Sequence, residues 1–360
     1  MIDNIRIIIP VKEKDIDVSN WNVVVDENCL QLYYYIFIRR IRIAYYPSSE
    51  NLLIGGKITG IDNYGNVRNL DDIFCSRIEL EKFFEDFNSK INKYIKGKKI
   101  DILTNKSTRI DFCFNIKTDY VKEYIKFFNL FYTYNKDNRF LNYSNFNEIK
   151  DIEPNSSFYL KTAGQMQYNQ NQNFTINFYD KENQLIYRRK KQLEKQNKSF
   201  IKSEEIEESK GILRLEVQSH YVYLKSICKK FDIDFKNRKL IDFVDIKIAE
   251  YAVCNKIEQF FTKYDFYSYN YVKQLLNTMK VTKDFKEYVL AKSKNNKVSS
   301  RYFDQKLMRL GICPYMFIPS KWGIEKLDNP IKLIKRKISD NNLYGLALTA
   351  GDKNELQNSA

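Results

Sequence analysis

Three segments of the chain alternate apolar and polar residues strictly enough to favour a single kind of structure, the β-strand of a two-faced sheet. They are TRIDFCF, TINFYDK and ILRLEVQ, at residues 108–114, 175–181 and 212–218. Side chains of a strand point alternately to the two faces of a sheet, so residues two apart share a face. Each segment therefore predicts one apolar face and one face of polar and charged side chains.

The polar residues of these strands form three pairs, one for each strand: Arg109 and Asp111, Tyr179 and Lys181, Arg214 and Glu216. If the strands are neighbours, their shared face carries two carboxylates that can hold Mg²⁺ or Mn²⁺ through hard oxygen ligands. Its cations can neutralise a phosphate, and its phenol is a nucleophile for phosphodiester chemistry. The alternative interpretation is an ordinary solvated sheet face, on which cross-strand Arg–Glu pairs are common.

The remaining pattern predicts an α+β fold. Further strands are predicted at residues 4–10, 31–46, 51–60 and 157–162, and helices at 76–96, 119–134 and 220–231. From about residue 235 onward the apolar spacing is almost entirely helical. We therefore expect an antiparallel sheet with flanking helices, followed by a mainly helical C-terminal domain.

The change in pattern also predicts the division into domains. Residues 1–230 are expected to form the sheet domain, residues 231–345 the helical domain, and residues 346–360 a flexible tail. Between the second and third strands, residues 184–210 are densely charged, as in a solvated helix or linker. Within this segment, residues 187–202 are a candidate contact to the DNA backbone, with a solubilising linker as the alternative.

The charge of the chain points to a polyanionic partner. Its net charge is +15, and 27 tyrosines accompany the lysines and arginines. Basic side chains that follow phosphates and rings that stack on bases are typical of nucleic-acid binding. The alternative is that the charge serves solubility alone.

Several classes of protein are disfavoured by what the sequence contains. The six cysteines include no C-x-x-C pair, and a single histidine cannot complete a zinc site of the usual Cys and His type. No apolar run approaches the roughly 18 residues that span a bilayer. We expect a soluble intracellular protein without membrane contact.

A resemblance to a known family is carried by five segments in order along the chain: MIDNIRIIIP, STRIDFCFNI, INFYDKENQL, GILRLEVQSHYVYLKS and SRYFDQKLMRLGICPYMF. In these segments the chain resembles the gene II replication initiators of filamentous phages and the related plasmid gene II/X replication proteins. The resemblance implies a rolling-circle initiator that nicks one strand at an origin, becomes joined to the 5′ phosphate through a tyrosine and leaves a 3′ hydroxyl as primer.

The same resemblance implies a fold, a cofactor and partners. The fold is that of the tyrosine endonuclease class, which builds its site on an antiparallel sheet. The cofactor is Mg²⁺ or Mn²⁺. The partners are origin DNA, single-stranded or supercoiled, together with a host helicase and polymerase, and the location is the cytoplasm of a bacterial host.

Roles follow for individual residues where the motifs match. The family's Tyr-x-Lys motif places the nucleophile at Tyr179, and the Tyr-Leu-Lys-Ser motif after the third strand makes Tyr223 its rival. The other expected roles are metal ligation by Asp111 and Glu216, and phosphate or DNA binding by Lys181, Arg109, Arg214 and Lys225.

Two features depart from the family and its wider class. The wider class carries a histidine-hydrophobic-histidine metal motif, which a chain with one histidine cannot form. That histidine, His220, is interpreted as a helix-start residue, with metal ligation or base chemistry as the alternative. Asp180 stands where the phage motif has an apolar residue, and alternation predicts that it points away from Tyr179.

Two other functions remain open at this point. One is a sequence-specific DNA-binding protein on the same fold without nicking activity, which would tolerate loss of both candidate tyrosines. The other is a nickase of the conjugative relaxase kind, with the same chemistry used for transfer rather than replication.

Overall fold

The computed structural model describes most of the chain. Its described residues are 1–26, 31–38, 41–58, 67–68, 77–96, 99–134, 140–142, 157–162, 174–196, 199, 201–294 and 300–341. The tail predicted at residues 346–360 lies outside them. Within the described residues, no helix combines the length and the apolar character needed to cross a lipid bilayer.

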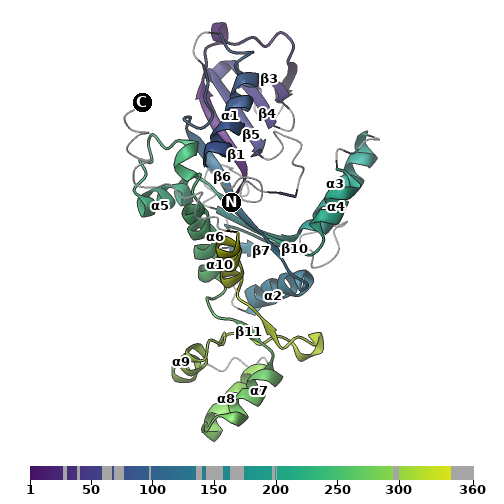
Figure 1. Ribbon diagram of the computed structural model, residues 1–360, viewed down its shortest axis with the longest axis vertical. Coiled ribbons are helices and arrows are strands. Elements are labelled where there is room, and N and C mark those ends of the chain that lie inside the picture. Colours follow the sequence, from purple (N-terminus) through teal and green to yellow (C-terminus); the bar gives the residue numbers. More distant parts are fainter. Residues whose placement is uncertain are drawn as a thin grey trace.

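One long antiparallel sheet forms the body of the molecule (Figure 1). In spatial order its ten described strands are β2 (Asn22–Asp26), β3 (Gln31–Ile38), β4 (Ile41–Tyr46), β5 (Asn51–Lys57), β1 (Ile2–Pro10), β6 (Ser107–Lys117), β10 (Ile212–Ser219), β9 (Phe174–Asp180), β8 (Ser157–Thr162) and β7 (Phe140–Asn142). Together with the helices around it, the sheet confirms the predicted α+β class.

The three strands with alternating patterns are neighbours at the centre of this sheet. Strand β10 pairs with β6 on one side and with β9 on the other. In this register Arg214 lies opposite Asn115 on β6 and opposite Tyr179 on β9. The predicted polar residues therefore do share one face, which is called the polar face below.

The opposite face of these strands is covered by helices. They are α2 (Val121–Tyr134), α5 (Tyr221–Phe231), α6 (Ile246–Phe260) and α10 (Pro330–Asp340). Phe128 of α2 is fully buried, and its ring lies 5.2 Å from that of Phe178 on β9 and 4.7 Å from that of Phe261, between ring centroids. Packed aromatic side chains of this kind bury large areas and dominate core energetics.

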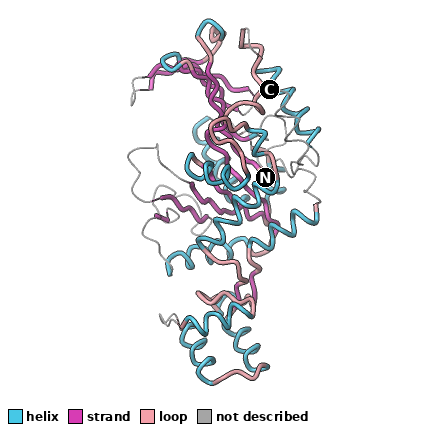
Figure 2. The backbone as a smooth tube through the Cα atoms, turned by 90° about the vertical axis from the view of Figure 1, so that its left-hand side faces the viewer, coloured by secondary structure: helices cyan, strands magenta, loops and turns pink. Residues whose placement is uncertain are grey.

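Helices α5, α6 and α10 share this core with the sheet, so the core continues past residue 230, where the sequence predicts a domain boundary. A second, smaller core belongs to helices α7 (Tyr269–Thr278), α8 (Lys283–Ser293) and α9 (Arg301–Arg309). These three helices stand apart at the lower end of the molecule in both views (Figures 1 and 2), next to the short pair β11 (Phe266–Tyr267) and β12 (Lys326–Leu327). The position of the domain boundary stays a prediction.

The N-terminal half of the sheet differs from the prediction in detail. Residues 31–46 are predicted as one strand, but they form two, because β3 pairs antiparallel with β4. Helix α1 (Arg77–Ile91) confirms the predicted helix and contributes Leu80, Phe84 and Phe87 to the main core. The charged segment 184–210 contains two helices, α3 (Lys181–Gln196) and α4 (Ser203–Ser209).

Truncation of the Phe128 ring tests the packing of the main core. We expect Phe128→Ala to lower the free energy of unfolding by about 3–5 kcal/mol, because the substitution opens a cavity among rings that cannot close around it. Lys122→Ala, at an exposed position of the same helix, should change it by less than about 0.5 kcal/mol. Urea denaturation followed by circular dichroism measures both, and equal effects of the two substitutions would contradict the packing described here.

Candidate functional site

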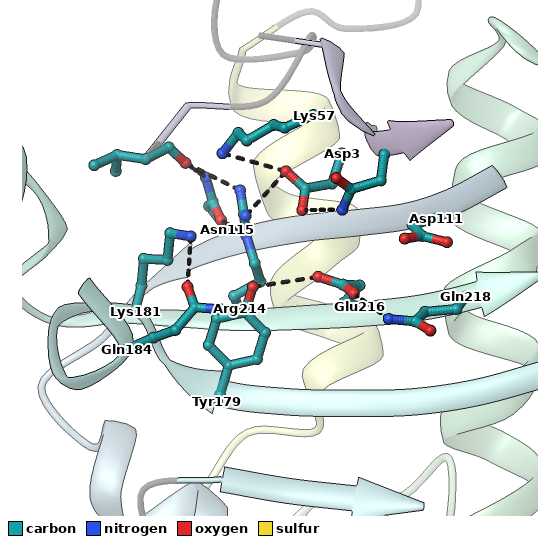
Figure 3. Close-up of polar contacts among 12 residues, drawn as sticks. Asp3, Lys57, Asp111, Asn115, Tyr179, Lys181, Gln184, Arg214, Glu216 and Gln218 are labelled. Atoms are coloured by element: carbon teal, nitrogen blue, oxygen red, sulfur yellow. Dashed lines mark hydrogen bonds and ion pairs between the residues drawn. The ribbon is translucent and has the colours of Figure 1, made fainter. Parts of the chain in front are cut away.

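The polar face is buried over its central part, not solvated. The exposed fraction is 0% for Arg214 and Asp111, 3% for Glu216 and 4% for Tyr179. The interpretation of a solvated strand face is therefore wrong for these four residues, and their expected binding to phosphate or metal stays a prediction. Burying charges and hydroxyls requires partners for them, since an unpaired buried charge is strongly unfavourable. Figure 3 shows how these partners are arranged.

The guanidinium of Arg214 is held from three directions. Its Nε donates to Asn115 Oδ1 at 2.9 Å, its Nη1 to Asp3 Oδ1 at 3.1 Å and its Nη2 to the backbone carbonyl of Val67 at 3.0 Å. Lys57 Nζ lies 3.2 Å from the same oxygen of Asp3. Burial alone would raise the pKa of Asp3, but the charges of Arg214 and Lys57 outweigh it and hold the pKa far below its usual value.

Sequence reasoning missed Asp3 and Lys57. Alternation along β1 puts Asp3 on the same side as Ile5, away from the polar face. The pairing of β1 with β6 shifts register between Ile2 and Asn4, and this irregularity accompanies the turn of Asp3 toward Arg214. Alternation along β5 could have placed Lys57 on the polar face. It lies two residues after Gly55 and so shares the face of Gly55, which pairs with Arg6 of β1. The pKa of Lys57 is lowered to about 8, chiefly by burial; the charge of Asp3 opposes this lowering and the charge of Arg214 adds to it.

Tyr179 lies beside a carboxylate. Its hydroxyl donates to Glu216 Oε2 at 3.2 Å, and Gln218 Nε2 donates to Glu216 Oε1 at 3.1 Å. Burial raises the pKa of the Tyr179 phenol well above 10, and the charge of Glu216 adds to the effect. Burial also raises the pKa of Glu216, with a further contribution from Asp3. The phenol is thus protonated at neutral pH and has a proton acceptor in contact with it.

Lys181 lies beside the same cluster, but it belongs to a helix and not to the strand in which the sequence predicted it. Strand β9 ends at Asp180, and Lys181 is the first residue of α3. Its Nζ donates to Gln184 Oε1 at 2.8 Å and lies 5.6 Å from the centroid of the Tyr179 ring. Burial lowers its pKa well below 10.5, and the neighbouring charge of Arg214 lowers it further.

Asp180 points away from the phenol, as alternation predicts. Its Oδ1 accepts the backbone N–H of Asn183 at 3.2 Å, and its Oδ2 accepts the Asn183 side-chain amide at 3.0 Å. An aspartate that accepts from the third residue of the next turn is a typical helix N-cap. Asp180 therefore starts α3 and so fixes where Lys181 lies.

The two carboxylates expected to bind metal are each engaged within the protein. Arg109 holds Asp111 through both oxygens, from Nε at 2.8 Å and from Nη2 at 2.6 Å. The oxygens of Glu216 accept from Tyr179 and Gln218. Among the described residues, no group of three or more His, Cys, Asp or Glu side chains is arranged to hold a metal ion. This arrangement does not fit a bound Mg²⁺ or Mn²⁺, and the metal stays a prediction from the resemblance.

Tyr223 and Lys225 lie away from the polar face. The Tyr223 hydroxyl donates to the backbone carbonyl of Ala252 on α6 at 2.8 Å, and its ring contacts Phe174 at 5.8 Å between centroids. Phe174 belongs to the apolar face, so the sheet separates Tyr223 from Tyr179. Lys225 is exposed on α5, and His220 is the N-cap residue of that helix, as predicted.

A small apolar cluster covers part of the polar face. It consists of Val67, Leu185 and Ile201, with Ile206 and Ile212 packed against it. Ile212 shares a strand face with Arg214, so the cluster lies over that end of the site. We call it the cover. Next to it is a cavity of about 630 Å³ that reaches Asn115. Its charged lining consists of Arg68, Lys117, Arg336 and Lys337 together with the carboxylates of Glu208 and Asp340.

Searches against protein-family models, curated proteins and solved structures find no match for this chain.

A double-mutant cycle tests whether Asp3 and Arg214 act as a unit. Asp3→Asn and Arg214→Met should each lower the free energy of unfolding by about 3–5 kcal/mol, because each leaves a buried partner uncompensated. The double variant should lose clearly less than the sum of the two. The exposed pair Arg68–Glu208, at 2.7 Å, provides the control, and Glu208→Gln should cost less than about 1 kcal/mol. Additive losses for Asp3 and Arg214 would contradict the coupling.

A second prediction concerns Asp111, whose pKa burial raises to about 7 against the lowering effect of Arg109. Between about pH 4 and pH 7 the folded protein then binds a proton that the unfolded chain releases, so this group reduces stability as the pH rises through that range. Asp111→Asn removes the titration. We expect the free energy of unfolding of the variant, measured by urea denaturation, to rise relative to that of the wild type by up to about 4 kcal/mol between about pH 4 and pH 8. A difference that does not vary with pH would contradict the raised pKa.

Proposed function

We propose that this protein nicks one strand of DNA, with Tyr179 as the nucleophile, and initiates rolling-circle replication at an origin. The observation that carries the proposal is the hydrogen bond from the Tyr179 hydroxyl to Glu216 beside a cluster of buried cations. A phenol needs a base to become a nucleophile near neutral pH, and a contacting carboxylate supplies one. The resemblance to gene II/X initiators supports the same reaction.

In the proposed reaction, the Tyr179 oxygen attacks the scissile phosphorus as its proton passes to Glu216. The bond from phosphorus to the 3′ oxygen breaks, and that oxygen takes up a proton from solvent water and becomes the 3′ hydroxyl. The phosphate stays joined to Tyr179 and to the 5′ oxygen of the downstream strand. The raised pKa of Glu216 favours its protonated form once it has accepted the proton.

The cations around Tyr179 support a phosphate as the group that is bound. Three basic side chains lie near two carboxylates: Arg214, Lys57 and Lys181 near Asp3 and Glu216. Repulsion among the basic groups contributes to the lowered pKa values of both lysines. An anionic phosphate oxygen would relieve that repulsion and favour the charged form of both lysines.

The reaction requires that the cover move, because Tyr179 is 4% exposed. The cover has only three fully buried apolar residues among those described, whereas the other face of the sheet packs on the main core. Segments with few buried apolar contacts open at low free-energy cost. Basic side chains outnumber acidic ones in the lining of the cavity beside Asn115, so this cavity gives the DNA backbone a place to lie next to the opening.

A second candidate function is DNA binding without nicking. It is favoured by the burial and internal pairing of the polar face, which would then serve only to hold the sheet together. The basic surface would be kept, and Tyr179 would be a structural side chain. A relaxase-like nickase shares the chemistry of the first proposal and differs in the DNA that it serves.

Capture of the covalent intermediate separates these functions. Purified protein is incubated with Mn²⁺ and a single-stranded oligonucleotide that carries the replicon's origin, and the readout is an adduct that survives SDS. We expect wild type and Tyr223→Phe to form the adduct, since the Tyr223 hydroxyl is committed to Ala252. Tyr179→Phe should lower the yield at least a hundredfold, because it has no nucleophilic oxygen.

Circular dichroism of each variant guards against loss of folding, since Tyr223→Phe removes a buried hydrogen bond worth about 1 kcal/mol. An adduct that persists in Tyr179→Phe and disappears in Tyr223→Phe would transfer the role to Tyr223. Salt-sensitive DNA binding with no adduct from any of the proteins, across several origins and metals, would establish the non-catalytic function.

A further inference from the structure

The far end of the sheet carries a row of aromatic side chains on one face. Tyr33, Tyr35 and Phe37 alternate along β3, so all three point to the same side. Tyr46 of β4 joins them, with its ring 5.2 Å from that of Tyr33 between centroids. Along the row, the centroids of Tyr33 and Tyr35 are 6.2 Å apart and those of Tyr35 and Phe37 are 5.9 Å apart.

A guanidinium lies among these rings. Arg42 of β4 pairs with Phe37, and its guanidinium carbon is 5.1 Å from the Tyr33 centroid and 5.2 Å from the Tyr35 centroid. Cation–π contacts of this kind fix the orientation of the rings and place a positive charge beside them. We call Tyr33, Tyr35, Phe37, Tyr46 and Arg42 the aromatic row.

The aromatic row is not part of the core. Phe37 is 55% exposed, and the other four side chains are partly exposed. The core of this end of the sheet lies on the other face, where Ile43 of β4 and Ile54 of β5 are buried with Phe84 of α1. Cross-strand aromatic pairs stabilise sheets, but a run of rings left open to solvent beside an arginine is also what base-stacking surfaces consist of.

The sheet connects the aromatic row to the polar face. Across the strands, Arg42 lies opposite Gly55 of β5, Gly55 opposite Arg6 of β1, and Arg6 opposite Arg109 of β6. Arg6 is exposed, and Gly55 leaves the surface between the arginines without a side chain. An added Cβ at Gly55 would meet only an ordinary contact at 3.5 Å, so close packing does not require the glycine. A basic path thus leads from the rings toward Asp111 and Tyr179.

We propose that the aromatic row is a docking surface for single-stranded DNA, on which unpaired bases stack while Arg42 and Arg6 contact the phosphates. A duplex keeps its bases stacked on one another and cannot offer their faces to the rings, so the surface selects an unpaired strand. The inference rests on the proposed function in that the bound strand is the one presented to Tyr179. Its recognition by stacking is independent of sequence.

Fluorescence anisotropy with a labelled oligothymidylate in EDTA tests the proposal without nicking. Loss of two rings of the aromatic row in the full-length double variant Tyr35→Ala, Phe37→Ala should weaken binding about fivefold to a hundredfold. The conservative variant Tyr35→Phe, Phe37→Tyr keeps the rings and should bind within about twofold of wild type. Val23→Ala and Val25→Ala, on the opposite face of the paired strand β2, are exposed controls and should bind as wild type does.

Three results would overturn the proposal: binding by the alanine variant equal to that of wild type, equal affinity for a duplex of the same length, or tighter binding of oligouridylate RNA. If the alanine variant fails to fold, the conservative variant still tests the proposal. Weak binding by the folded conservative variant, which keeps both rings, would count against stacking. The outcome is separate from that of the nicking assay. A protein that binds through the rings but forms no adduct would retain this surface and lose the proposed reaction.

Discussion

The fully buried guanidinium of Arg214 is the group on which the arrangement of the polar face depends. Removing a charge from water is so unfavourable that the guanidinium must be matched by a carboxylate and by further acceptors. Asp3, Asn115 and the Val67 carbonyl supply them. These partners come from β1, from β6 and from the segment before α1, so a single interaction ties distant parts of the chain to β10. Tyr179 and Glu216 are positioned beside this interaction.

The two faces of the central strands differ in how firmly they are covered. One face packs on the rings of α2 and on α5, α6 and α10 in a continuous core. The other is closed at the Arg214 end by a cover with three fully buried apolar residues among those described. This asymmetry matters for the proposed reaction, because the side that would have to admit a phosphate is the side with less apolar burial. The same asymmetry continues to β3, where one face is core and the other carries exposed rings.

The sequence predicted the central strands and their polar residues, because alternation determines the face on which each side chain lies whatever its partners are. It did not separate Tyr179 from Tyr223. Tyr179 belongs to a strand with a charged face, and Tyr223 follows such a strand on a helix. Which side of that helix meets the core depends on how the helix packs. The contact of the Tyr223 hydroxyl with Ala252 arises from the packing of α5 on α6. Asp3 was beyond prediction as well, since an irregular register moves it off the face that alternation assigns.

What the sequence by itself determined is the local periodicity: which segments are strands, which residues share a face, and that the chain is strongly basic. The tertiary structure decided the order of the strands, the burial of the polar face and the pairing of Arg214 with a residue more than two hundred positions away. The physical reason is that periodicity is a property of neighbouring residues. Desolvation and charge pairing depend on which surfaces meet, and those meetings exist only once the whole sheet has formed.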